Sequence, residues 1–179
     1  IEGRGDLYRS DGRLDKWLEL VEGFGPKKGC VVEVGCAPGI MLDELSRRGY
    51  ECLGVEISES VAAWLRSRVS FEVRSGFFPG IELPRVDLFL AFDVLEHSPD
   101  PVAFLSEVAR LLKPGAVAII QTPIDRYECS PPFGPQFENI FDDVEHTFLY
   151  TDRAVELLAA RAGMELVSIE HRTMLAGEI

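Results

Sequence analysis

The chain has 179 residues, of which 46% are hydrophobic and 27% are charged, as expected for one globular domain with a sizeable core. Its formal net charge of −12 disfavours nucleic acid as a large partner, because an acidic surface repels phosphate backbones. There is no run of about 18 apolar residues and no signal peptide, so we expect no membrane span, no secretion and a cytoplasmic location.

Two further features of composition limit the interpretation. The cysteines show neither CxxC pairing nor metal-ligand spacing, so we expect small, reduced core residues and no metal; they are Cys30, Cys36, Cys52 and Cys129. The segment Ile1–Arg4 matches a protease recognition site used in recombinant expression. We interpret it as a cloning scar and expect a single domain over residues 5–179.

The first predicted elements are a helix and then a strand, a loop and a second helix. Leu14, Trp17, Leu18 and Val21 recur at helical spacing within Arg13–Glu22. Cys30–Val34 is apolar and β-branched, as in a buried strand, and a loop of small residues follows it. Helix Ile40–Arg48 comes next. A strand, a small-residue loop and a helix form the first unit of a nucleotide-type binding fold.

The next stretch repeats the alternation of strands and helices. Strand Glu51–Ile57 contains the acid Glu56 near its end, and Ser58 can cap helix Glu59–Arg68. Ser70–Arg74 is a third predicted strand, and a loop follows over residues 76–84.

The second half of the chain continues the pattern. Val86–Phe92 predicts a fourth strand covered on both faces, and Asp100-Pro101 begins a helix that Pro114-Gly115 ends. A fifth strand is expected over Ala116–Gln121. These alternating elements predict an α/β fold with a doubly wound, mostly parallel sheet.

A long loop and two more elements complete the chain. Thr122–His146 is irregular and rich in proline and aromatic residues, so we interpret it as a lid-like loop. Its aromatic side chains could form a wall of a pocket or an anchor for the loop. Thr151 caps a helix that runs to Ala162, and Met164–Glu170 is a sixth predicted strand.

The spacing of glycine and acidic residues indicates the ligand. Glu56 lies 21 residues after Gly35, at a strand end where a carboxylate can accept hydrogen bonds from both ribose hydroxyls; the alternative is an exposed acid. The dinucleotide motif GxGxxG would need a third glycine where Ile40 stands, and no GxxxxGK[ST] motif is present. A ribonucleoside held without a phosphate cradle is the remaining interpretation.

Several phrases of the sequence together resemble a known family. Glu33-x-Gly35-x-Ala37-x-Gly39 with Glu56 is similar to the signature of class I S-adenosylmethionine-dependent methyltransferases. The segments 93–97 (Asp-Val-Leu-Glu-His) and 111–115 (Leu-Leu-Lys-Pro-Gly) also recur in that family. Segments 145–148 and 162–164 are similar to the small-molecule methyltransferases of ubiquinone biosynthesis. The resemblance covers about residues 13–169.

The resemblance implies a cofactor, S-adenosyl-L-methionine, with S-adenosyl-L-homocysteine as the product, and it implies a small-molecule acceptor that we expect to be methylated on a hydroxyl. It also implies positions for the parts of the cofactor. Glu33 and the loop Gly35–Ala37 would hold its amino-acid end, Glu56 its ribose and Ile57 its adenine, and Phe92–Val94 would line the region of its sulfonium. The residues expected to touch it are Glu33, Gly35, Cys36, Ala37, Gly39, Glu56, Ile57, Phe77, Phe92, Asp93 and Val94.

A base is needed only if the acceptor must lose a proton, and histidine has a suitable pKa. His97 is the first candidate, because it follows the fourth strand on the cofactor side, and His146 is the second. Either could instead be a loop histidine bonded to the backbone.

The chain also departs from the family pattern. Many relatives carry Gly-Asp after the third strand, where this chain has Ser75-Gly76-Phe77, so adenine would be held by stacking on Phe77 or by backbone groups. A seventh strand would be short or missing. A non-catalytic binding or interaction domain therefore remains an alternative, and an NAD(P)-dependent oxidoreductase a weaker one. The sequence leaves the oligomeric state open.

Overall fold

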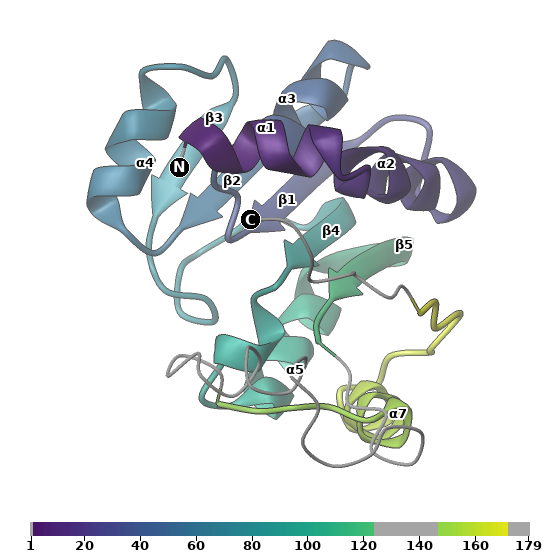
Figure 1. Ribbon diagram of the computed structural model, residues 1–179. Coiled ribbons are helices and arrows are strands. Elements are labelled where there is room, and N and C mark those ends of the chain that lie inside the picture. The colour runs from purple at the N-terminus through teal and green to yellow at the C-terminus, as the bar shows by residue number, and fades with distance from the viewer. Residues whose placement is uncertain (1, 124–146, 172–179) are drawn as a thin grey trace, which may run out of the picture.

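Over the residues that the structure describes, the centre of the fold is a parallel sheet of five strands (Figure 1). The computed structural model describes residues 2–123 and 147–171. The strands are β1 (Cys30–Val34), β2 (Glu51–Glu56), β3 (Glu72–Ser75), β4 (Val86–Phe92) and β5 (Leu112–Gln121). Their spatial order is β3-β2-β1-β4-β5, so the chain changes direction across the sheet between β1 and β4. This is the doubly wound fold that the sequence predicts.

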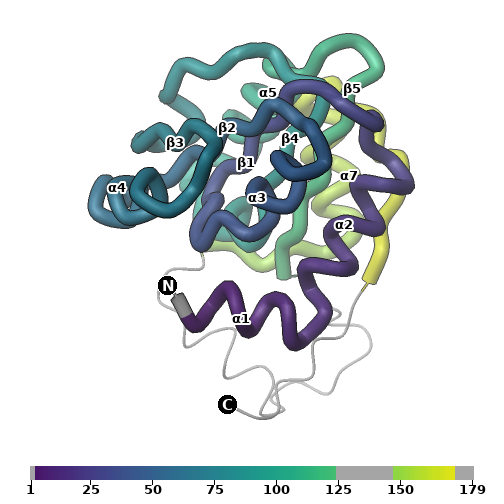
Figure 2. Tube along the Cα trace, turned by 90° about the horizontal axis from the view of Figure 1, so that it is seen from above, coloured from purple at the N-terminus to yellow at the C-terminus, as the bar shows by residue number. Residues whose placement is uncertain are grey.

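Helices cover both faces of the sheet (Figures 1 and 2). They are α1 (Glu2–Ser10), α2 (Arg13–Phe24), α3 (Ile40–Arg47), α4 (Glu59–Arg66), α5 (Pro101–Leu111) and α7 (Asp152–Arg161), with a 3₁₀ turn η1 (Leu95–His97). One core lies between the sheet and α2, α3 and α4, and the other lies between the sheet and α5 and α7. None of these helices is long and apolar enough to cross a lipid bilayer.

The strand β4 shows how one apolar run supplies both cores. Leu88, Leu90 and Phe92 point into the first core, whereas Phe89 and Ala91 point into the second. Because successive side chains of a strand point to opposite faces, a strand buried on both faces must be apolar at nearly every position.

The predicted helix starts are confirmed by their hydrogen bonds. The Ser58 hydroxyl accepts from the Val61 N–H (3.5 Å), and the Asp100 carboxylate accepts from the Ala103 N–H (2.9 Å). Thr151 caps α7 in the same way, by accepting from Ala154.

Two predictions about the elements are wrong, and one helix was not predicted. The helix that was not predicted is α1, which packs on the loop after β1 and the start of α3: a Cβ on Gly5 would lie 3.4 Å from Pro38 and 3.2 Å from Ile40. The strand β5 starts at Leu112, so Pro114 and Gly115 lie within the strand instead of ending α5.

The second wrong prediction is the sixth strand over Met164–Glu170. Within residues 2–123 and 147–171 this segment pairs with no strand. Its residues have other partners: the Met164 N–H donates to Ala159, and Glu170 pairs with Lys16 (2.9 Å). Val167 is 72% exposed. The alternation of apolar residues indicates that a strand could form, but not whether the segment lies beside an edge strand such as β5. The lid-like loop, apart from Thr122 and Pro123, and the place of a seventh strand after residue 171 lie outside the described residues.

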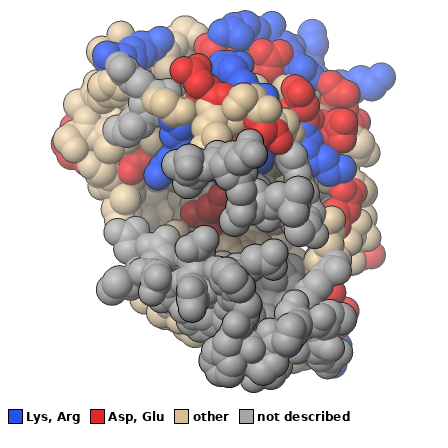
Figure 3. Space-filling view, in the orientation of Figure 1, with Lys and Arg blue, Asp and Glu red and all other residues tan. Residues whose placement is uncertain are grey.

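Many charged side chains of the described residues form ion pairs on the surface. Figure 3 shows basic and acidic side chains mixed over the upper part of this view. Arg48 of the α3 C-terminus, for example, bonds to Glu22 of α2 (2.6 Å) and to Glu44 (3.1 Å). These exposed pairs are worth little individually, but they connect α2 to α3.

Candidate functional site

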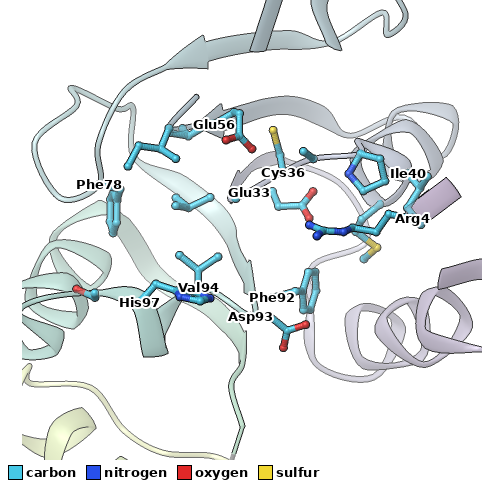
Figure 4. Close-up of a pocket in the computed structure, with 18 of the residues that line it drawn as sticks. Arg4, Glu33, Cys36, Ile40, Glu56, Phe78, Phe92, Asp93, Val94 and His97 are labelled. Atoms are coloured by element: carbon cyan, nitrogen blue, oxygen red, sulfur yellow. The ribbon is translucent and has the colours of Figure 1, made fainter. Parts of the chain in front are cut away.

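A pocket of about 490 Å³ opens at the carboxyl ends of β1, β2 and β4 (Figure 4). Ligands bind at this place in doubly wound sheets, because loops diverge where the strand order reverses. Its volume is in the range of small-molecule sites. Figure 3 shows acidic side chains deep in the hollow on this face.

Most of the residues predicted from the sequence line this pocket. The lining residues among them are Glu33, Gly35, Cys36, Ala37, Glu56, Ile57, Phe77, Phe92, Asp93, Val94 and His97. Gly39 is not one of them: it is the N-cap of α3, with a φ of 89°, and its Cα faces Leu65 and Phe71. His146 lies outside the described residues.

The loop after β1 approaches its neighbours too closely for side chains at two positions. A Cβ on Gly35, whose φ is 71°, would lie 2.5 Å from Val94 on the loop after β4. A Cβ on Gly54 of β2 would lie 2.6 Å from the Cys36 sulfur and 3.3 Å from Leu42. The glycines therefore let this loop settle against both neighbouring strands, which shapes the pocket floor.

Glu33 is a buried carboxylate that faces the pocket. It is 5% exposed, and its Oε2 has no hydrogen-bond partner among the described residues. Burial raises the pKa of Glu33 well above its usual value of 4.5. An unpartnered buried acid is costly, so this position is suited to a ligand that donates hydrogen bonds.

Glu56 is held at the end of β2 by its own loop. Its side chain is 9% exposed, and its Oε1 accepts from the Ser58 N–H (3.0 Å). Ile57 and Phe77 lie beside it on the pocket lining, and both are well exposed for apolar residues, at 68% and 48%. The result is an oriented carboxylate next to an apolar lip.

Part of the wall comes from α1, a helix that was not predicted from the sequence. Arg4 and Tyr8 both line the pocket, and Figure 4 shows Arg4 reaching in from α1. The Tyr8 ring packs edge-on against Trp17 (5.3 Å between centroids), and the Arg13 guanidinium lies 4.1 Å from the Tyr8 centroid. Burial raises the pKa of Tyr8. Because Ile1–Arg4 was interpreted as a cloning scar, only the residues of α1 after Arg4 could have indicated that a helix forms here.

The end of β4 supplies a polar chain of contacts. The Trp17 indole N–H donates to Oε1 of Gln121 (2.8 Å), and Nε2 of Gln121 donates to Oδ1 of Asp93 (2.8 Å). Trp17 also stacks on Phe92, with centroids 4.2 Å apart. Asp93 has a φ of 55°, in the left-handed region. Trp17 was predicted only as a core residue, and Gln121 only as the end of a strand.

The turn η1 brings a histidine and two buried polar groups near the pocket. His97 and Ser98 line it, and the buried Ser98 hydroxyl has no partner among the described residues. Glu96 instead points away into the structure, where its Oε2 accepts from Thr122 (2.9 Å) and its backbone carbonyl accepts from the Thr147 N–H (2.9 Å). Burial raises the pKa of Glu96. Within residues 2–123 and 147–171, no group of three His, Cys, Asp or Glu could hold a metal ion.

Comparison with known proteins gives consistent matches. The family model described as "Methyltransferase domain" matches residues 8–169. A ubiquinone biosynthesis O-methyltransferase of Alkalilimnicola ehrlichii is 29% identical over 118 residues, which are 62% of this chain and 47% of that protein. A protein of Mycolicibacterium smegmatis named "Probable S-adenosylmethionine-dependent methyltransferase" is 34% identical over 104 residues, 56% of this chain and 40% of that one.

A solved structure shows the same fold over nearly the whole chain. It belongs to the "Complex between the Haloferax volcanii Trm112 methyltransferase activator and the putative methyltransferase", with a TM-score of 0.80 and 17% identity. The match covers 98% of this chain and 78% of that one. By contrast, the chain spans less than half the length of the two curated relatives named above.

Proposed function

Because this chain belongs to the methyltransferase domain family, we propose that it transfers a methyl group from S-adenosylmethionine to a hydroxyl group of a small-molecule acceptor. The observation that carries the proposal is the pair of buried carboxylates, Glu33 and Glu56, on either side of the Gly35 loop. The names of the O-methyltransferase relatives support a hydroxyl as the target.

The residues of the pocket fit this cofactor. Glu33 offers an unpartnered carboxylate oxygen, which suits the ammonium group at the amino-acid end. The Gly35–Ala37 loop lets the cofactor approach its backbone closely. A side chain at position 35 is excluded, because a Cβ on Gly35 would clash with Val94. Glu56 would accept from the ribose hydroxyls, while Ile57 and Phe77 would exchange exposure to water for contact with adenine.

The chemistry requires little of the protein beyond orientation. When bound, S-adenosylmethionine supplies an electrophilic methyl group: a C–O bond forms to the acceptor, and the electron pair of the breaking C–S bond stays on sulfur. The wall of Phe92, Asp93 and Val94 would hold the acceptor against that methyl group. His97, on the same side of the pocket, would take the hydroxyl proton.

The test is a calorimetric titration of the protein with S-adenosylhomocysteine, with NADH as the comparison. Micromolar binding of the first and none of the second is the expected result. Absence of S-adenosylhomocysteine binding would contradict the proposal, and binding of NADH alone would favour an oxidoreductase.

A non-catalytic binding domain is the second candidate, and the segment Ser75-Gly76-Phe77 supports it, since the acid common in relatives is absent there. It would bind S-adenosylhomocysteine as well. Formation of S-adenosylhomocysteine from S-adenosylmethionine, followed with a set of phenols, catechols and sugars as acceptors, separates the two. The enzyme shows turnover with at least one of them, and the binding domain shows none.

A further inference from the structure

The hydrogen bonds around Asp93 have a fixed direction. The Trp17 indole N–H can only donate, so the Gln121 atom that it meets at 2.8 Å must be the carbonyl oxygen. The amide NH₂ of Gln121 then faces Asp93 and can only donate to it, also at 2.8 Å. This orientation of the amide follows from the chemistry of the indole, and it requires Asp93 to be an acceptor.

Asp93 is also held by its backbone. Its N–H donates to the Gln121 carbonyl (3.0 Å), so the same residue of β5 fixes both the main chain and the carboxylate. A left-handed φ is unfavourable for a residue other than glycine unless the surroundings enforce it. The Trp17 indole, which begins this series of hydrogen bonds, is itself fixed by stacking on Phe92. Asp93 is therefore positioned before any ligand arrives.

Among the described residues, only one oxygen of the Asp93 carboxylate accepts a hydrogen bond, which leaves the other for a ligand. Oδ1 receives the Gln121 amide, and no other hydrogen bond to this carboxylate occurs among the described residues. Asp93 lines the pocket together with Tyr8 and His97. Figure 4 shows it at the end of the site opposite Glu56, with Phe92 and Glu33 between.

We propose that Asp93 binds the hydroxyl group of the methyl acceptor and that Gln121 and Trp17 are positioning residues for it. The inference rests on the proposed function. Glu33 and Glu56, on β1 and β2, supply the carboxylates for the ammonium and the ribose of the methyl donor. Asp93 follows β4, on the opposite side of β1, so it lies where the second substrate must approach.

The hydrogen bonds from Trp17 through Gln121 to Asp93 form a relay. The two tryptophans of the chain allow this relay to be followed by NMR. Trp17 and Trp64 each give one indole N–H signal, and Trp17→Phe and Trp64→Phe assign them. Trp64 lies on α4 beside Arg68, outside the pocket lining, so Trp64→Phe is the matched control. In Asp93→Asn and Gln121→Met the Trp17 signal should move while the Trp64 signal stays. A Trp17 signal unmoved in both variants would overturn the relay.

Binding of a hydroxyl is tested on protein saturated with S-adenosylhomocysteine, with catechol as the probe. Catechol should shift the Trp17 signal saturably, and its dimethyl ether, which has no O–H, should not. Asp93→Asn and Trp17→Phe should weaken catechol binding by about tenfold or more, the usual effect of losing or misdirecting a hydrogen bond to a charged group. For Trp17→Phe, which lacks the reporter signal, binding is followed by calorimetry.

The remaining outcomes also decide the question. Equal catechol binding by wild type and Asp93→Asn, or no response to catechol in wild type, would overturn the assignment. So would a tenfold loss of S-adenosylhomocysteine affinity in Asp93→Asn, because the carboxylate would then serve the methyl donor. If wild type binds no S-adenosylhomocysteine, the proposed function fails, and the catechol titration of the free protein still tests Asp93.

Discussion

At the scale of single residues, the carboxylates of the pocket differ in what surrounds them. Glu56 is oriented by the Ser58 N–H, whereas Glu33 is buried without a partner for one oxygen, and Asp93 is held by Gln121. The three oxygens left for a ligand come from three different strand ends. Each residue can therefore be tested by its own substitution.

Glu56→Gln should weaken S-adenosylhomocysteine binding by about 10- to 100-fold, because charged hydrogen bonds to the ribose are replaced by neutral ones. Calorimetry gives the affinity. The control is Glu51→Gln, at the exposed opposite end of the same strand, which should bind as wild type does. Equal affinities for the two variants would remove Glu56 from the site.

His97→Ala should lower kcat by about 100-fold or more, the usual contribution of a general base, and should leave S-adenosylhomocysteine affinity unchanged. The rate is measured with the acceptor identified by the turnover screen. His171→Ala is the matched control, since His171 contacts Asp152 on the surface, away from the pocket lining. A normal rate in His97→Ala would exclude it as the base.

At the scale of elements, the caps and apolar stripes were read correctly from the sequence. The helix α2 buries the four residues of its predicted stripe, and β4 has the predicted bounds. These features are local: a stripe or a cap is written in consecutive residues. What failed depends on distant parts of the chain. Whether Met164–Glu170 forms a strand depends on whether it lies beside an edge strand such as β5, and the role of α1 depends on its contact with the loop after β1.

The N-cap of α5 allows an element to be tested alone. Asp100→Ala should lower the free energy of unfolding by about 1 kcal/mol, because the Ala103 N–H loses its acceptor. Urea unfolding should show a lower midpoint with an unchanged slope. Asp100→Ser, which keeps a capping oxygen, should recover most of the loss; an Asp100→Ala protein as stable as wild type would contradict the cap's contribution.

At the scale of the whole molecule, the residues of the pocket were more predictable than the residues that position them. The residues at the ends of β1, β2 and β4 were named from the family resemblance and, for Glu56, from its place at a strand end; they line one pocket because parallel strands bring their carboxyl ends to one edge. Trp17 and Gln121 were not named as part of the site, because they lie 104 positions apart and meet only through the packing of α2 on the sheet. A tryptophan in an apolar stripe gives no sign that its N–H points at a functional site.

The buried carboxyls should also govern how stability depends on pH. Burial raises the pKa of Glu33 and Glu96 above 4.5 in the folded state, so folding favours their protonated forms. Their effect on stability is therefore most favourable below pH 4.5 and is lost as the pH rises through the raised values. Glu33→Gln should make the free protein more stable at pH 7 and weaken S-adenosylhomocysteine binding.

Urea unfolding of wild type and Glu33→Gln at several pH values checks this prediction. The stability advantage of the variant should grow from pH 4.5 upward, and Glu51→Gln, exposed on β2, should show no such trend. An advantage that is constant with pH, or a loss of stability at pH 7, would show that the Glu33 charge does not cost the folded protein stability.

The contact between Gly54 and Cys36 has a consequence for how this sequence can change over generations. A methyl group at position 54 would lie 2.6 Å from the Cys36 sulfur and 3.3 Å from Leu42, so β2 can gain a side chain there only after Cys36 has been replaced by a smaller residue. A substitution of Cys36 followed by one of Gly54 is thus tolerated, whereas the reverse order is not. The history of the pocket floor is constrained by steric exclusion between two residues that are 18 positions apart in sequence.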